Sequence, residues 1–227
     1  AAFEPALDYC GVKIPRWPFD KFAAGDRTTG SQMKATGEVM AIDRRFEAAL
    51  QKAVRSLEFG NRTLLWEDRS WGDRPGDLPL HPHDLRLWAV MAALRRGATP
   101  EDLALATGID PWFIGQMGHI VEMERRLLAE ALTPGLLREA KRLGFSDEQV
   151  GTLADRTPEQ VRQWRQECGL RPVYKMVDTC AAEFEASTPY FYSSYDQNNE
   201  AQPLNGRKAV VIGSGPIRIG QGIAQDQ

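Results

Sequence analysis

Cysteine is scarce in this sequence of 227 residues, and the few that occur follow no pattern. Cys10, Cys168 and Cys180 are far apart, and no C-x-x-C pair occurs. An odd count without framework spacing indicates reduced thiols in a cytoplasmic protein rather than disulfides, and we expect small buried side chains. No residue is marked as a partner base, so the sequence gives no reason to predict a catalytic cysteine.

Long apolar runs and an excess of basic charge are also missing. No apolar run approaches the roughly 20 residues that span a bilayer. The first residues, Ala1–Pro5, have neither the basic nor the apolar segment of a signal peptide. The 28 basic and 31 acidic residues give a net charge of −3, which argues against nucleic acid or an anionic membrane as a partner. The composition is that of an ordinary globular protein.

The C-terminal residues carry the most informative pattern. Lys208–Ile212 is an apolar, β-branched run typical of a strand, and a glycine-rich turn over 213–222 follows directly. Many α/β domains begin with a strand that leads into such a turn. Only Ile223–Gln227 remain, too few for a crossover helix and a partner strand. We therefore expect the chain to be a piece of a larger protein, cut inside the first unit of its next domain.

The first 58 residues predict a small α/β segment. Leu7–Ile14 has the pattern of a strand that ends at Pro15, and Glu38–Ile42 that of a short buried strand. Apolar residues then recur at helical spacing, at Phe46, Leu50, Ala53, Val54 and Leu57. A piece of this size does not close its own sheet, so it resembles the end of a domain.

Residues 59 to about 170 predict a compact bundle of short helices. Four hydroxyl residues stand where helix N-caps are expected: Thr99, Thr133, Ser146 and Thr157. Four glycines stand where left-handed residues end helices: Gly97, Gly108, Gly144 and Gly169. The apolar stripes between them predict that Trp88, Trp112 and Trp164 are largely buried. Residues 171–206 predict a connector that is extended after Pro172 and ends in a polar linker.

The candidate chemical sites are weak when judged from the residues alone. The glycine-rich turn (Gly213, Gly215, Gly220) departs from G-x-G-x-x-G, and glycine loops without a phosphate are common. His81-Pro82-His83 lacks further residues at ligand spacing, so a surface loop is the simpler interpretation. We interpret His119 as a bonded or surface histidine. We predict no catalytic residue and no metal ligand.

One binding alternative comes from residues 145–170. Two capped helices around Ala154–Thr157 resemble a helix-turn-helix, which would place the second helix in the major groove of DNA. That helix carries Arg162 and Arg165 but also acidic side chains, in an acidic chain. A packed helical hairpin is the simpler interpretation, and a DNA-binding module stays as the alternative.

Five segments stand in a fixed order along almost the whole chain: Phe3–Tyr9, Lys13–Trp17, Met33–Ile42, Pro172–Phe184 and Ile212–Ile223. Together they resemble the large subunit of carbamoyl phosphate synthetases. Pro172–Phe184 resembles the segment that closes the family's oligomerisation domain. Phe3–Tyr9, Lys13–Trp17 and Met33–Ile42 are similar to the end of its first ATP-grasp half, and Ile212–Ile223 to the opening of the second. The resemblance implies a mainly α chain with three parts: the end of the carboxyphosphate domain (1–58), a helical oligomerisation domain with connector (59–200), and the start of the carbamoyl phosphate domain (201–227).

The resemblance also implies a function for the whole enzyme. The family makes carbamoyl phosphate from bicarbonate, glutamine-derived ammonia and two ATP, with Mg or Mn, in arginine and pyrimidine biosynthesis in the cytoplasm. A small glutaminase subunit supplies ammonia, and a tunnel carries unstable intermediates. Met33, Glu38 and Gly222 match positions of the tunnel wall, although Ala224 departs from the family's carboxylate. Glu38 is also interpretable as a solvated or salt-bridged side chain.

The same resemblance implies that this segment holds neither ATP site and no cofactor, and is inactive alone. It would act by self-association through the helical domain, without nucleic acid or membrane as a partner. Phe113, Met117 and Ile120 are expected either on the association surface or in the core beneath it. The sequence does not decide between these two positions.

Overall fold

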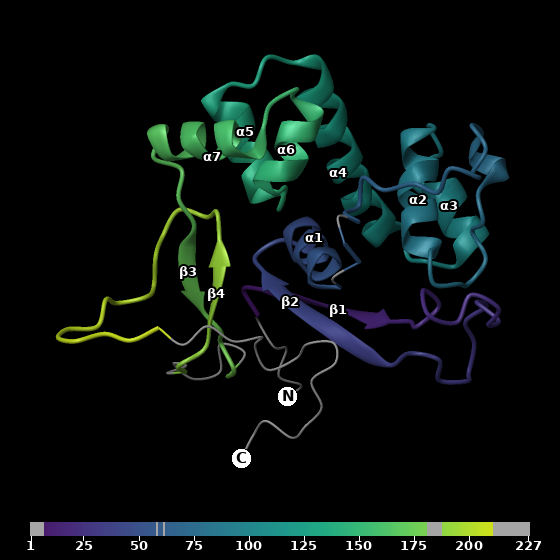
Figure 1. Cartoon of the computed structure of the whole chain (residues 1–227), viewed down its shortest axis with the longest axis horizontal. Helices are drawn as coiled ribbons and strands as arrows, with labels where there is room; N and C mark the ends of the chain where they lie inside the picture. The colour runs from purple at the N-terminus through teal and green to yellow at the C-terminus, as the bar shows by residue number, and fades with distance from the viewer. Residues whose placement is uncertain (1–6, 58, 61, 181–187, 211–227) are drawn as a thin grey trace, which may run out of the picture.

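Seven helices and two small antiparallel sheets make up the described part of the chain in the computed structural model, which confirms a mainly α fold. It describes residues 7–57, 59–60, 62–180 and 188–210 (Figure 1). Most of the helices lie above the two sheets in that view. Within these residues no helix is long and apolar enough to cross a membrane. The predicted strand at 208–212 extends outside the described residues, and the glycine-rich turn lies entirely outside them.

The first sheet pairs β1 (Cys10–Arg16) with β2 (Gly37–Asp43). Val39 and Ala41 point into the core and alternate with exposed Glu38 and Met40, as a strand with one covered face requires. The prediction of a strand over Leu7–Ile14 is wrong at both ends. The strand begins at Cys10 and continues through Pro15, which a two-stranded ribbon allows because each strand has an edge that needs no N–H donor.

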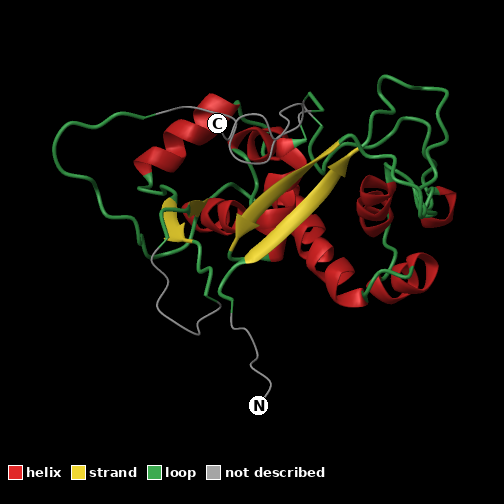
Figure 2. Cartoon of the chain, turned by 90° about the horizontal axis from the view of Figure 1, so that it is seen from below, coloured by secondary structure: helices red, strands yellow, loops and turns green. Residues whose placement is uncertain are grey.

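Helix α1 (Phe46–Ser56) covers one face of this ribbon, as the apolar spacing predicts. Figure 2 shows the ribbon from below, lying across the helical layer. Ala48, Ala49 and Ala53 are almost fully buried, so the backbone of α1 lies close to its neighbours. A Cβ at Gly144 would lie 2.6 Å from Cα of Ala48, and Gly144 has a φ of +90°. Only glycine meets both requirements at that turn.

The helical region follows the predicted start and stop residues. Each of the four predicted hydroxyl caps accepts a hydrogen bond from the backbone N–H three residues later. The four predicted terminal glycines all have positive φ. The helices of this region are α2 (Arg86–Arg95), α3 (Pro100–Thr107), α4 (Pro111–Ala129), α5 (Pro134–Arg142), α6 (Asp147–Leu153) and α7 (Pro158–Glu167), with a short 3-10 turn, η1, at Pro75–Asp77.

The prediction of three buried tryptophans is correct only for Trp88, which is 2% exposed. Trp164 is half-buried on α7, and Trp112 is 55% exposed. Trp112 and Phe113 are consecutive in the first turn of α4, and neighbouring residues of a helix point in different directions. The core side of this helix is formed by Ile114 and Met117 instead. The cysteines are free, as expected, but half-buried rather than buried.

The connector after the helices is more ordered than the sequence indicates. The predicted extended segment after Pro172 forms β3 (Val173–Met176), and it pairs with β4 (Phe191–Ser194). The mixed aromatic and polar residues at 190–195 gave no strand signal. β4 contacts β2 and buries Tyr192 and Ser194, so the chain returns to the first sheet after the helical region.

Candidate functional site

Two of the three residues predicted to line a tunnel, Met33 and Glu38, lie at the surface of the described structure. Met33 is 86% exposed in the loop before β2. Glu38 lies on the outer face of β2, where a carboxylate oxygen is 2.7 Å from Nζ of Lys13 and both side chains are about half exposed. Glu38 is thus salt-bridged, as the simpler interpretation states. Its tunnel role stays a prediction, and Gly213, Gly215, Gly220 and Gly222 lie outside the described residues.

The histidines form no metal site in the part of the chain that the structure describes, where no group of three potential ligands converges. The rings of His81 and His83 stack with centroids 4.6 Å apart in a surface loop. Nδ1 of His119 lies 2.9 Å from a carboxylate oxygen of Glu47, whose side chain is only 6% exposed. His119 is thus both bonded and exposed, which confirms its interpretation as a bonded or surface histidine.

Of the two arginines proposed for DNA contact, one is bonded within the protein and the other is exposed. Arg165 on α7 donates hydrogen bonds to both carboxylate oxygens of Asp147 at the start of α6. It also bonds the carbonyl of Leu170 and is only 12% exposed in its side chain. Arg162 remains exposed on α7. The arrangement therefore matches the packed helical hairpin.

A buried polar cluster joins the last three helices to the connector. Nζ of Lys141 on α5 lies 2.9 Å from Asp147 and 5.0 Å from the ring of Tyr195. Burial lowers the pKa of Lys141 to about 8, although the charge of Asp147 opposes this shift. Burial disfavours the charge on Asp147, but hydrogen bonds from Arg165 and Lys141 outweigh it and lower the pKa of that carboxyl. No local pattern in the sequence indicates this cluster, because its members come from separate elements.

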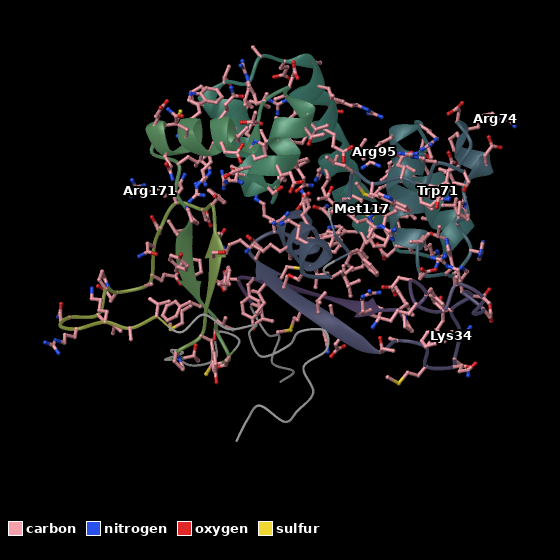
Figure 3. All side chains as sticks on the ribbon, in the orientation of Figure 1. Lys34, Trp71, Arg74, Arg95, Met117 and Arg171 are labelled. Atoms are coloured by element: carbon pink, nitrogen blue, oxygen red, sulfur yellow. The ribbon has the colours of Figure 1, made fainter. Side chains whose placement is uncertain are left out.

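A second polar cluster fastens α2 to α4. Arg95, which Figure 3 labels, donates to Glu124 at 2.6 and 2.8 Å, to Glu67 at 3.0 Å and to the carbonyl of Leu64 at 2.7 Å. Burial alone would lower the pKa of Arg95, but the two carboxylates outweigh it and raise that pKa. Both clusters satisfy charges that the folded chain buries, and neither pairs a nucleophile with a base. Their geometry is that of a rigid support.

Three aromatic rings gather at the N-terminal ends of α1 and α4, and we name them the aromatic patch: Phe46, Trp112 and Phe113. The ring centroids are 5.8 Å apart for Phe46–Trp112, 5.3 Å for Phe46–Phe113 and 5.0 Å for Trp112–Phe113. Phe113 is 42% exposed, whereas Met117 and Ile120 are buried in the core. Of the three residues expected on an association surface or in the core, Phe113 is therefore at the surface and the other two are in the core. The pattern in the sequence that could have indicated this patch is the pair of consecutive aromatic residues, Trp112 and Phe113, just after the N-cap Asp110.

A cavity of about 270 Å³ adjoins the N-terminus of α1 and is lined by charged side chains of three helices. Besides His119, its charged lining has three basic and three acidic residues: Arg45, Arg126 and Arg142, and Glu47, Glu122 and Glu139. Arg126 lies 2.5 Å from Glu139, and His119 is bonded to Glu47. Because most of these charges already pair with each other, the cavity shows no excess charge for a ligand.

Comparisons with known proteins give one consistent result. A family model described as "Carbamoyl-phosphate synthetase large chain, oligomerisation domain" matches residues 38–169. The whole chain is similar to the carbamoyl phosphate synthase large chains of Thermomicrobium roseum (63% identical), Methanothrix thermoacetophila (48%) and Kineococcus radiotolerans (50%). Each match covers 21% of the relative, so the chain spans about a fifth of the length of the curated relatives that it matches.

Proposed function

The chain belongs to the family of carbamoyl phosphate synthetase large chains and includes its oligomerisation domain, and on this basis we propose that it serves as the self-associating spacer between two catalytic halves of such an enzyme. The match over 38–169, which spans all seven helices, is the observation that carries the proposal. The helix-turn-helix interpretation has no support from these comparisons.

The activity that we propose for the whole large chain is an ATP-dependent ligation. It would form carbamoyl phosphate from bicarbonate, two ATP and ammonia delivered by a small glutaminase subunit, in arginine or pyrimidine biosynthesis in the cytoplasm. Carboxyphosphate and carbamate react readily with water, so their path must exclude solvent and its walls must be held rigidly. Met33 and Glu38, with Gly222, would contribute to that wall in the assembled enzyme.

The described residues are best suited to give rigid support to the rest of the enzyme. Arg95 fixes α2 to α4 through a buried ion pair, and Lys141, Asp147 and Arg165 fix α5, α6 and α7. Charge networks of this kind fix orientation because each partner left alone would be a buried, uncompensated charge. A domain built this way would hold the spacing of the parts on either side.

The nucleotide and metal chemistry is proposed to come from other parts of the large chain. ATP bound with Mg or Mn supplies phosphoryl groups in the proposed reaction. Among the described residues no three carboxylate, histidine or cysteine side chains converge, which agrees with this proposal. We expect isothermal titration calorimetry of this chain with ATP and magnesium to show no saturable heat. Saturable binding at micromolar ATP that disappears on Gly215→Val would contradict this.

Self-association is tested by sedimentation velocity over a range of protein concentrations at low and high salt. Association through apolar burial is expected to persist at high salt. DNA binding through Arg162 would weaken steeply as salt rises, because neutralised phosphates release counterions. A salt-tolerant dimer without a DNA gel shift is the expected result. A monomer at all concentrations with tight, salt-sensitive DNA binding would overturn the proposal.

A further inference from the structure

We propose that the aromatic patch (Phe46, Trp112, Phe113) is a docking surface for another part of the same large chain, not for a second copy of it. The inference rests on the proposed function, because it assumes that the chain acts inside a longer polypeptide. Its partner is a tethered apolar surface in the four fifths of the relatives' length that this chain does not match.

The patch is an unusual use of large apolar side chains. Trp112 is 55% and Phe113 42% exposed, although both lie in the first turn of a helix whose next residue, Ile114, is fully buried. Their rings contact each other and Phe46 edge-on or tilted, so they form one surface rather than three scattered side chains. Aromatic side chains gathered at the surface in this way are typical of interfaces, where such residues are enriched.

The size of the patch distinguishes between the two possible occupants. An aromatic side chain of this kind offers about 150–250 Å², so the exposed fractions of Trp112 and Phe113 leave on the order of 200 Å². A stable interface between separate molecules buries about 800 Å² on each partner. The patch is too small to hold a second copy by itself. A tethered domain needs far less area, because the linker raises its effective concentration.

The position of the patch agrees with an occupant from the same polypeptide. Phe46 begins α1, which packs on the β1–β2 ribbon, whereas Trp112 and Phe113 begin α4 of the helical region (Figure 1). Whatever covers the patch must touch both units at their junction. Arg45 lies directly before Phe46, is exposed and has no ion-pair partner within the described residues. The proposed partner surface is therefore apolar and carries an acidic group at its edge.

The test compares this chain alone with the same chain placed inside a large chain. In the second protein it replaces the aligned 229 residues of the Thermomicrobium roseum large chain. Hydroxyl-radical oxidation of Trp112 is measured by peptide mass spectrometry, with an added dosimeter, at concentrations where sedimentation shows monomers. We expect oxidation of Trp112 to fall at least threefold in the large chain. Equal oxidation in an active large chain overturns the inference, as does protection that appears only when copies associate.

Paired variants provide a second measurement. Phe113→Ser is expected to lower the melting temperature of the large chain by several degrees more than that of the short chain. Leu128→Ser, which changes a 66% exposed residue of the same helix, gives the baseline for a polar residue on α4. Equal shifts from Phe113→Ser in the two proteins overturn the inference. A chimera that makes no carbamoyl phosphate contradicts the proposed function itself, so the two failures are distinguishable.

Discussion

A single buried lysine shows how much of this molecule depends on side chains that meet from distant positions. Lys141 is 6% exposed on the inner side of α5, where Asp147 from α6 compensates its charge. It stands directly after the buried Ala140, at a position where a lysine is ordinarily solvated. The capping hydroxyls were predictable because a cap bonds a backbone N–H only three residues away. The burial of Lys141 was not, because its partners come from other helices.

The pH dependence of folding tests the state of Lys141. Its pKa is about 8 in the folded chain and about 10.4 in an unfolded one. Between these values the unfolded state binds more protons, so the free energy of unfolding should rise with pH by up to about 1.4 kcal/mol per unit. Below about pH 8 Lys141 is charged in both the folded and the unfolded state, so the full free-energy cost of burying its charge is present.

Lys141→Met is the control for this effect, because methionine is similar in length and does not titrate. Urea unfolding at pH 7.5, 8.5 and 9.5 should show the wild-type chain gaining stability relative to Lys141→Met as pH rises. A constant difference across this range would mean that Lys141 keeps an ordinary pKa in the folded state.

At the scale of elements, two helical glycines predict opposite effects of the same substitution. A Cβ at Gly151 in α6 would lie 2.6 Å from the carbonyl oxygen of Arg156, a backbone atom that cannot move aside. Gly151→Ala should therefore destabilise the chain by about 1–3 kcal/mol. A Cβ at Gly115 in α4 would meet nothing within 4 Å. Gly115→Ala should stabilise the chain by up to about 1 kcal/mol, because alanine favours the helix.

Thermal unfolding followed by circular dichroism at 222 nm compares these two variants with the wild-type chain. Each variant serves as the control for the other, since both exchange glycine for alanine inside a helix. If Gly151→Ala does not lower the melting temperature, the close packing of α6 against the turn before α7 is contradicted. A lower melting temperature for Gly115→Ala contradicts the open space beside Gly115.

Elements with strong local signals were predictable, and those that depend on a distant partner were not. The helices at 100, 134, 147 and 158 begin directly after their predicted caps. β4 has no such signal, because four residues of mixed character become a strand only by pairing with β3. The exposure of Trp112 was missed for a related reason: helical periodicity defines a stripe but does not show where the stripe's partner surface ends.

At the scale of the whole molecule, the chain is held together where its return segment meets its first sheet. Asp43 at the end of β2 is 4% exposed, lies 2.6 Å from Nζ of Lys52 and accepts a hydrogen bond from Oγ of Ser194 at 3.1 Å. Lys52 also donates to the carbonyl of Ser193. Asp196 lies between Arg44 and Arg142, at 3.5 and 3.6 Å. The connector is therefore fastened both to the α/β segment and to the helical region, which suits a part that maintains spacing.

Replacing Asp43 should release this connection before it unfolds the helices. Asp43→Ala leaves the Lys52 charge without its carboxylate, which should destabilise the chain by about 3 kcal/mol. Ser194→Ala removes only one neutral donor and should cost about 1 kcal/mol. In the Asp43→Ala chain, hydrogen exchange measured by mass spectrometry should be faster than in the wild-type chain at Tyr192 and its neighbours in β4. Exchange in α4 should be unchanged. A different result is slow exchange of β4 in the Asp43→Ala chain, equal to that of the wild-type chain, although the global stability has fallen. In that case β4 is held in place by its pairing with β3 alone. The connector would then not fix the position of the segment that follows the helices relative to the first sheet.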